Sequence, residues 1–238
     1  DANDVGVDYW QPSFKKFAIK SGVEVVQIET LYPIENLCFI SLEYHRLIVP
    51  ERFKTNNLFN IHFSLLPAYK GMYTSAHPIL NDEKTTGCSI HRIDSGIDTG
   101  EIISQIAFSI ASHDNCKDIY EKYLLNGRKL TYSTIDSLIL DNFKSKKQAT
   151  DGASYYSKKS INYSNLVVDF SHSALNVSAQ LRAYTFRDYQ LPTVEGFQIF
   201  GHSITDTPSK GMPGAVLEST ENYLKISTKD FDMLLFID

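Results

Sequence analysis

Cysteine is scarce in this sequence of 238 residues, with three copies, Cys38, Cys88 and Cys116. An odd number without C-x-x-C spacing argues against a disulfide framework and against a structural zinc site, and it indicates a reducing compartment. A long apolar segment is also missing, since no run reaches the roughly 20 residues that cross a bilayer. With no secretory leader in sight, we expect a cytoplasmic protein that does not associate with a membrane.

An excess of positive charge is missing too. Lys and Arg number 23 against 28 Asp and Glu, which gives a net charge of −5 and a pI of about 5.8. Such a balance provides no basic surface for a polyphosphate backbone, so we expect no nucleic-acid partner. The hydrophobic share of 42% and the charged share of 21% are ordinary for a globular chain, and the length allows one sizeable domain with a smaller one.

The first half of the chain predicts alternating strands and helices. Short runs rich in β-branched and apolar residues predict strands over 23–28, 37–42 and 58–62, with a short helix beginning at Pro50 between the second and the third. This order favours parallel βαβ units. Further along, the patterns predict a helix over 75–81, strands over 87–93 and 100–110, and helical segments over 115–126 and 130–140.

The composition changes after residue 142. Residues 142–159 are rich in Ser and Lys, residues 173–184 show helical spacing, and short strands broken by Pro and Gly follow from Val194. We therefore expect an α/β protein: a Rossmann-like domain with a mostly parallel sheet over 1–142, a linker, loop and helix over 143–193, and a small antiparallel β unit over 194–238.

Polar residues gather around the end of the third predicted strand. Asn60 and His62 are two apart, so their side chains point to the same face of the strand. An amide and an imidazole together form a donor pair that stabilises an oxyanion. Asp98 lies in a glycine-flanked loop, from which it could tune His62 or accept a proton through water. These residues suit acyl transfer to an external amine, which is its own nucleophile.

Two other interpretations of these residues stay open. A histidine near a strand end is often a hydrogen-bonded structural residue, and an Asp-x-Gly loop is often only a turn. A metal site is a further alternative, with His62, His91, Asp94 and Asp98 as ligands, although no HExxH-type helical spacing supports it.

The ordered motifs narrow the choice. NIHFSLLPAYKG, beginning at Asn60, and TGCSIHRIDSGIDTGEII, beginning at Thr86, closely resemble the signature of the folate-dependent formyltransferase family. The resemblance implies that Asn60 and His62 meet the formyl oxygen, with Asp98 as their acidic partner. It implies N10-formyltetrahydrofolate as the formyl donor, and no metal.

The resemblance also implies a folate pocket made largely by main-chain contacts. Its residues would follow the strand over 37–42 and precede the acidic partner. In this chain they are Leu42, Glu43, Tyr44, Leu47, Asp94 and Ile97. The family's first strand and turn have no counterpart in the opening residues of the chain, so we expect that strand to be absent.

The acceptor is indicated by three further segments. Met72-Tyr73-Thr74, residues 154–161 and residues 180–192 look like parts of the sugar N-formyltransferases, which act on dTDP-linked amino-dideoxy sugars destined for surface polysaccharide such as O-antigen. Cationic side chains suit a pyrophosphate and tyrosines suit a base or a sugar hydroxyl. The candidate substrate-binding residues are Lys70, Met72, Tyr73, Tyr156, Lys158, Arg182, Tyr184, Arg187 and Tyr189.

The identity of the sugar stays open. We prefer dTDP-4-amino-4,6-dideoxyglucose slightly over 3-amino equivalents. Methionyl-tRNA formylation is the alternative with the same chemistry, and a non-catalytic module that binds nucleotide sugars or folates is the alternative of another class. A homodimer formed through the C-terminal strands is also expected, because an edge strand within 224–237 would otherwise be exposed.

Overall fold

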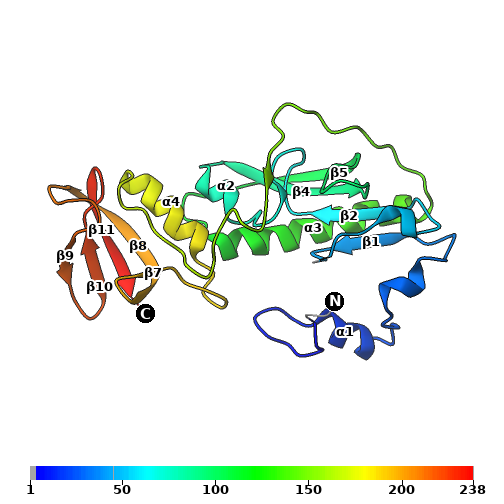
Figure 1. Ribbon diagram of the computed structural model, residues 1–238, viewed down its shortest axis with the longest axis horizontal. Coiled ribbons are helices and arrows are strands. Elements are labelled where there is room, and N and C mark those ends of the chain that lie inside the picture. The colour runs from blue at the N-terminus through cyan, green and yellow to red at the C-terminus, as the bar shows by residue number, and fades with distance from the viewer. Residues whose placement is uncertain (1–3, 45, 238) are drawn as a thin grey trace. The chain divides into compact units, whose positions relative to one another are not determined.

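The computed structural model describes residues 4–44 and 46–237. Figure 1 shows its helices and strands. In chain order they are α1 (Phe14–Lys20), the 3-10 helix η1 (Ile28–Leu31), β1 (Phe39–Leu42), the 3-10 helix η2 (Pro50–Arg52), β2 (Leu58–His62), β3 (Lys70–Gly71), α2 (His77–Leu80), β4 (Thr85–Arg92), β5 (Ile102–Ser109), α3 (Cys116–Ile139), β6 (Tyr155–Tyr156), α4 (Ala174–Tyr184), β7 (Thr193–Val194), β8 (Phe197–Pro208), β9 (Val216–Ser219), β10 (Tyr223–Ile226) and β11 (Phe231–Ile237).

The first sheet has the strand order β1-β2-β4-β5. β1 and β2 are parallel, as a βαβ-type connection requires, and β4 pairs with β2 in the antiparallel direction. In this register Asn60 lies between Ser41 on β1 and His91 on β4. The predicted α/β class is confirmed, and the described part of the sheet is mixed because β4 returns alongside β2.

The strand predicted over 23–28 is wrong. Residues 23–27 have no regular structure, and Ile28 begins the 3-10 helix η1. Val23, Val25 and Val26 are 58%, 48% and 43% exposed. Their β-branched side chains have no packed surface beneath them, and strand preference depends mainly on that packing.

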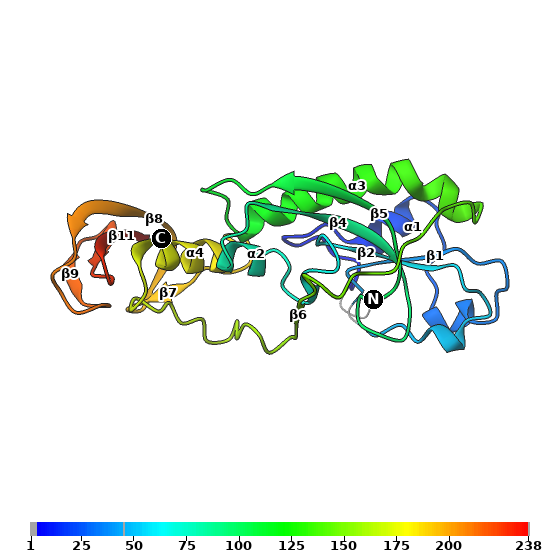
Figure 2. The ribbon, with the colours of Figure 1, turned by 90° about the horizontal axis from the view of Figure 1, so that it is seen from above.

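Helix α3 is one continuous helix of 24 residues, where the pattern predicted two segments. In Figure 2 it runs beside the first sheet. Gly127 lies in its middle, and a Cβ there would approach the Phe63 ring to 3.3 Å, so close packing rather than a break accounts for the glycine. Nearer its start, the Tyr123 hydroxyl hydrogen-bonds to Thr86 of β4 at 2.7 Å.

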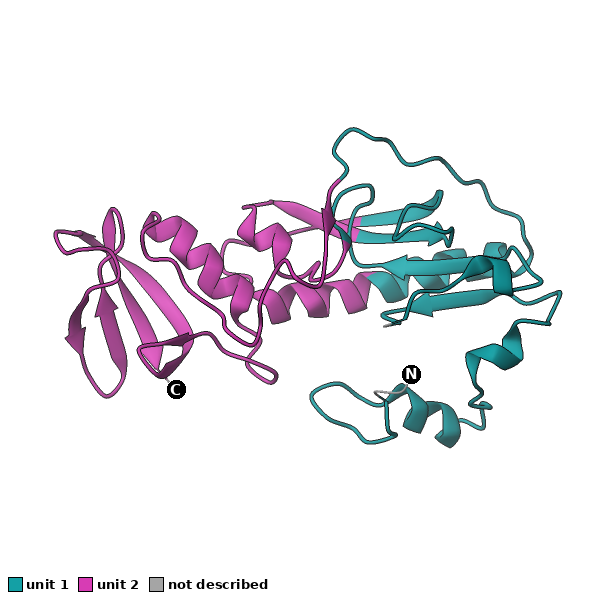
Figure 3. Cartoon of the chain, viewed as in Figure 1, with its two compact units in different colours: residues 1–70, 88–106, 127–153 teal, residues 71–87, 107–126, 154–238 magenta. Residues whose placement is uncertain are grey.

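The chain divides into two compact units, coloured separately in Figure 3. Unit 1 consists of residues 1–70, 88–106 and 127–153, and unit 2 consists of residues 71–87, 107–126 and 154–238. Each unit combines several separate segments of the chain, whereas the sequence predicted three consecutive segments with boundaries after residues 142 and 193. Those segment boundaries stay a prediction.

The C-terminal part of unit 2 is a sheet with the order β7-β8-β11-β10-β9 and antiparallel pairing. Helix α4 begins after Ser173, whose hydroxyl accepts from the Asn176 amide, and it buries Val177 and Leu181 in the same core as Met233 of β11. The expected antiparallel β unit is therefore confirmed. Its outer strands are β7 and β9, however, because β10 and β11 are both paired on two sides.

The structure also describes the cysteines and the longest helices, on which two of the expectations from the sequence depend. All three cysteines lie in the described part of the chain and are free thiols. Burial raises the pKa of the Cys88 and Cys116 thiols to about 12. Within the described ranges, no helix is both long enough and apolar enough to span a membrane.

Candidate active site

The end of β2 carries the two polar side chains singled out in the sequence. Phe59 and Ile61 are buried on one face, and Asn60 and His62 lie on the other. His62 is only 7% exposed. Such a buried imidazole requires partners for its ring nitrogens, and the next two segments of the chain provide them.

The turn after β2 provides the first partner. Tyr69 has a φ of +58°, and its carbonyl oxygen accepts a hydrogen bond from His62 Nε2 at 2.8 Å. Ser89 of β4 fixes the turn, because its hydroxyl donates to the Ser64 carbonyl at 2.7 Å and accepts from the Leu66 amide at 3.1 Å. Because Nε2 is the donor to Tyr69, the other nitrogen, Nδ1, is directed elsewhere.

The loop between β4 and β5 provides the second partner, Asp98. Asp98 has a φ of +53°, a conformation that Asp tolerates better than most residues. Gln148 fixes the backbone of this loop, because its Nε2 donates to the carbonyl oxygens of Asp98 and Gly100, each at 2.8 Å. Asp94 closes the loop on the other side by accepting from the Gly96 amide at 3.1 Å.

The Asp98 carboxylate meets three side chains. Its Oδ2 lies 3.5 Å from His62 Nδ1, and its Oδ1 lies 3.3 Å from Asn60 Nδ2 and 3.4 Å from His91 Nε2. The carboxylate is 13% exposed. The structure thus brings Asn60, His62 and Asp98 together within unit 1. Their catalytic role remains a prediction.

His91 is the member of this cluster whose place in the site the sequence analysis missed, since it was weighed only as a metal ligand. Its Nε2 lies 3.2 Å from Asn60 Nδ2. The signal was the strand pairing: His91 is directly opposite Asn60 in the antiparallel register. Among the described residues, no group of three His, Cys, Asp or Glu side chains is arranged to hold a metal ion.

Burial and charge act on His62 in opposite directions. Desolvation is the largest effect and lowers the pKa of the imidazole, while the Asp98 carboxylate and the bond to Tyr69 raise it, and His91 lowers it further. Since Nε2 already donates to Tyr69, a close approach of Nδ1 to a carboxylate oxygen is favourable only when a proton lies between them. The His62–Asp98 pair therefore suits the storage of one exchangeable proton.

The residues predicted to contact folate lie in unit 1, on the chain after β1 and in the β4–β5 loop. Leu42, Leu47 and Ile97 are 47%, 65% and 45% exposed, so apolar surface on both segments is available to a flat heterocycle. Glu43 has a φ of +48°. The Asp94 side chain is engaged within its own loop, which fits a contribution through the backbone. Tyr44 is partly buried beside the small core below β1. These features fit a folate.

Part of the predicted nucleotide-sugar site forms a cluster in unit 2. The Tyr73 hydroxyl donates to the Lys158 carbonyl at 3.1 Å, and the Tyr156 ring stacks on His77 with centroids 3.7 Å apart. Asn81 Nδ2 donates to the Tyr156 hydroxyl at 2.8 Å. The Lys158 side chain is exposed, and so is Met72. Lys70, the first residue of β3, belongs to unit 1. His77 and Asn81 were not predicted, because their roles depend on this long-range contact.

The other predicted substrate residues of unit 2 lie in different settings. Arg182 is half-buried, donates to the Asp114 carbonyl at 2.9 Å, and lines a cavity of about 200 Å³. The Arg187 guanidinium lies 5.0 Å from the Phe200 ring centroid. Tyr184 packs against the C-terminal core, and Tyr189 is 63% exposed.

Comparison with known proteins agrees with the motifs. Residues 33–135 match the Formyl transferase family. The solved structure of WlaRD, a sugar 3N-formyl transferase in the presence of dTDP and 5-N-formyl-THF, is 39% identical with a TM-score of 0.89, over 99% of this chain and 85% of that one. An N-formyltransferase from Helicobacter canadensis, in complex with folinic acid and dTDP-3-aminofucose, is 37% identical with a TM-score of 0.90, over 100% of this chain and 87% of that one.

A curated relative at lower identity is the methionyl-tRNA formyltransferase of Coxiella burnetii strain RSA 331, which is 26% identical over 91% of this chain and 68% of its own length. The two solved structures are similar enough over enough of their length to decide the family. The chain belongs to the formyltransferase family, as the motifs predicted, and it is therefore an enzyme that transfers a formyl group.

Proposed function

We propose that this protein transfers a formyl group from N10-formyltetrahydrofolate to the amino group of a dTDP-linked amino-dideoxy sugar. The observation that carries the proposal is the Asn60–His62–Asp98 cluster, joined by contacts of 3.3 and 3.5 Å, at the end of a buried strand. Its support is the full-length likeness to two solved N-formyltransferases, whose ligands include a folate and dTDP or a dTDP-sugar.

The chemistry follows from what each side chain can donate or accept. The folate supplies the activated formyl group, and the acceptor amine attacks it in its uncharged form. Asn60 donates an N–H group to the oxygen as negative charge develops on it, which is the differential stabilisation that speeds acyl transfer. His62 lies beside it, held by the Tyr69 carbonyl, with its Nδ1 toward the Asp98 carboxylate. Asp98 takes up the proton that the amine releases and later returns it to the departing nitrogen.

The position of the acceptor amine can be narrowed by the same likeness. WlaRD is a sugar 3N-formyl transferase, and the Helicobacter canadensis structure contains dTDP-3-aminofucose. A 4-N formyltransferase from Francisella tularensis is 25% identical with a TM-score of 0.64. These degrees of likeness support a 3-amino-3,6-dideoxyhexose as the acceptor, in preference to the 4-amino sugar that we favoured from the sequence.

A mass-spectrometric assay with a panel of acceptors tests this proposal. The protein is incubated with N10-formyltetrahydrofolate and with dTDP-linked 3-amino and 4-amino dideoxy sugars of gluco and galacto configuration. We expect a gain of one formyl group on a 3-amino member. Formylation of a 4-amino member alone would support the proposed reaction and contradict the 3-amino position of the acceptor amine. Binding of dTDP-sugars without product from any member would favour a non-catalytic binding module instead.

Methionyl-tRNA is the second candidate acceptor, because curated relatives across 91% of the chain carry that activity in their name. The balance of charge argues against it. Lys and Arg number 23 against 28 Asp and Glu, so the chain has no excess of cations to bind a polyphosphate backbone. A gel shift with charged initiator tRNA at moderate salt would support this acceptor, and indifference to the tRNA would remove it.

A homodimer through the C-terminal sheet remains part of the proposal. Strand β9 is one of the two outer strands of that sheet, and Val216 and Leu217 on it are 42% and 46% exposed. An exposed apolar edge strand is a natural site for pairing with a second copy. Sedimentation as a monomer at assay concentration would contradict this. The cytoplasmic location and the link to surface polysaccharide also stay predictions.

A further inference from the structure

His91 is a buried histidine whose two ring nitrogens have different kinds of partner. The residue is 2% exposed, and its Nδ1 lies 2.7 Å from its neighbour's carbonyl oxygen, that of Arg92. A carbonyl oxygen only accepts, so Nδ1 carries a proton whenever this bond is formed. The proton on the other nitrogen, Nε2, is therefore the one that can come and go.

Nε2 of His91 lies between a donor and an acceptor. Asn60 Nδ2 is 3.2 Å away and can only donate, while Asp98 Oδ1 is 3.4 Å away and accepts when it is ionised. Neutral His91 can accept from Asn60 through its Nε2 lone pair. Protonated His91 has no lone pair left and can only donate to Asp98. The two hydrogen bonds at Nε2 exclude one another.

We propose that His91 is a positioning residue that holds a proton during the reaction and thereby sets whether the Asn60 amide is available to the reacting oxygen. This inference rests on the function proposed above. With neutral His91, one Asn60 N–H is bound to Nε2 and the other faces Asp98. With protonated His91, Nε2–H turns to Asp98 and an Asn60 N–H is released toward the oxyanion.

The proton balance closes over one turnover. The attacking amine forms a bond to the formyl carbon and loses a proton, which reaches Asp98 Oδ1 and passes from there to His91 Nε2. The same proton returns through Asp98 to the nitrogen that departs when its bond to the formyl carbon breaks. Asn60 keeps both of its N–H bonds and only changes the acceptor. Uptake of the amine proton is thereby linked to stabilisation of the oxyanion.

The groups around His91 are consistent with this role. On β2 the titratable neighbour is His62, with ring centroids 6.3 Å apart at 81°. On the β4–β5 loop they are Asp98 and Asp94, and the Asp94 carboxylate already accepts from the loop itself. The strand on the other side, β5, has the sequence IISQIAFS and carries no titratable side chain. Asp98 is thus the carboxylate that balances a charge on His91.

Replacing His91 with glutamine tests the proposal, because the Gln side-chain oxygen can accept from Asn60 but takes no proton. We expect kcat to fall roughly 100-fold, the low end for loss of a proton-transfer group, with KM for both substrates within about twofold. The acid limb of the kcat–pH profile should also move, since glutamine takes no proton and Asp98 alone then accepts it.

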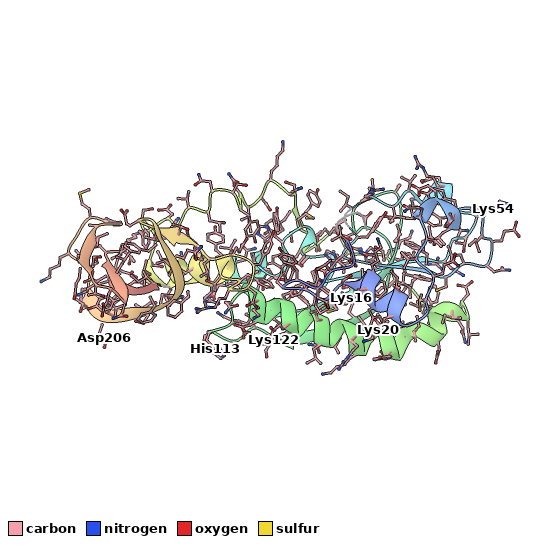
Figure 4. All side chains as sticks on the ribbon, turned by 90° about the horizontal axis from the view of Figure 1, so that it is seen from below. Lys16, Lys20, Lys54, His113, Lys122 and Asp206 are labelled. Atoms are coloured by element: carbon pink, nitrogen blue, oxygen red, sulfur yellow. The ribbon has the colours of Figure 1, made fainter. Side chains whose placement is uncertain are left out.

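A matched control is His113→Gln, at an exposed histidine that Figure 4 labels, and it should leave kcat and the acid limb unchanged. An unchanged rate or an unmoved limb in His91→Gln overturns the inference while leaving the proposed function intact. Absence of formyl product with the wild-type protein instead removes the function on which the inference rests.

A second measurement does not depend on a variant that must fold. In the ¹⁵N spectrum of histidine-labelled wild-type protein at alkaline pH, His91 should be the Nδ1–H tautomer because Nδ1 donates to the Arg92 carbonyl. The Nε2–H tautomer would overturn the inference, since Nε2 could then not accept from Asn60.

Discussion

Asp98 depends on its backbone conformation as well as on its charge. Its φ of +53° turns the carboxylate toward Asn60 and His62, and Asn is among the few other residues that adopt this region readily. Asp98→Asn should therefore fold with an almost unchanged melting temperature. Because the amide cannot take up the amine proton, we expect kcat to fall by at least about 100-fold with little change in KM.

Steady-state kinetics and a thermal melt of Asp98→Asn check this prediction. The comparison variant is Asp98→Ala, in which the β-carbon of alanine strains the same backbone without a polar side chain to compensate. It should lose stability as well as activity. A formyl-transfer rate near that of the wild type in Asp98→Asn would show that the carboxylate is dispensable.

The residue scale is also where the sequence was most informative. Asn60 and His62 share a face because side chains alternate along a strand, and that rule needs no tertiary structure. Asp98 was indicated by its glycine-flanked loop and then by the family motif. The place of His91 in the site could not be predicted, because its partner is decided by the antiparallel register of β4 on β2, and a shift of one residue would direct it to the opposite face.

The Ser89 hydroxyl helps to hold the turn between β2 and β3. Ser89 Oγ donates to the Ser64 carbonyl and accepts from the Leu66 amide and from Gln105 Nε2. Ser89→Ala leaves the buried Leu66 N–H without this partner, which should cost about 1–3 kcal/mol of unfolding free energy. Urea unfolding measures the loss. The control is Ser95→Ala, at an exposed position, and an equal effect of both substitutions would contradict the assignment.

The loop between β4 and β5 is held by Gln148. Its two hydrogen bonds go to the backbone carbonyls on either side of Thr99, so they fix the backbone position from which the Asp98 side chain extends. In Gln148→Ala we expect kcat to fall roughly tenfold, because small displacements of a catalytic group are costly. KM should change little, and the melting temperature should fall, because two backbone carbonyls lose their hydrogen-bond partner. Gln198→Ala on β8, at an exposed position, serves as the control and should retain full kcat.

Elements were predicted well where an apolar pattern was also buried. Strands β2 and β4 and helix α4 all match such patterns. The exposed run over 23–28 matched the pattern without the burial, and no strand formed. The short pair β3–β6 was not expected, because it joins Lys70–Gly71 to Tyr155–Tyr156 and a two-residue strand carries no periodic signal.

Two histidines of unit 2 make the whole molecule sensitive to acid. Burial lowers the pKa of His77 and of His202 from 6.5 to about 4. Both are neutral when folded, whereas the unfolded chain binds their protons below about pH 6.5. Their contribution is therefore fully present above pH 6.5 and is lost as the pH falls toward 4, by at most about 3 kcal/mol for each histidine.

Urea midpoints at pH 7.5 and pH 4.5 measure this loss. In His77→Phe the ring can still stack on Tyr156 but cannot be protonated, so the drop in the midpoint between the two pH values should be smaller than in the wild type. The variant also loses the bond to Ser160, which lowers its stability at both pH values. An acid drop as large as that of the wild type would contradict the role of His77.

Formyl transfer at the Asn60–His62–Asp98 cluster is the central claim, and the most direct measurement compares wild type with His62→Asn. Each protein receives N10-formyltetrahydrofolate and a dTDP-3-amino-3,6-dideoxyhexose, and the product is followed by mass spectrometry while circular dichroism confirms folding. We predict one added formyl group with the wild type and a rate lowered by at least about 100-fold in the variant. A folded His62→Asn protein that forms the product at the wild-type rate would contradict the account.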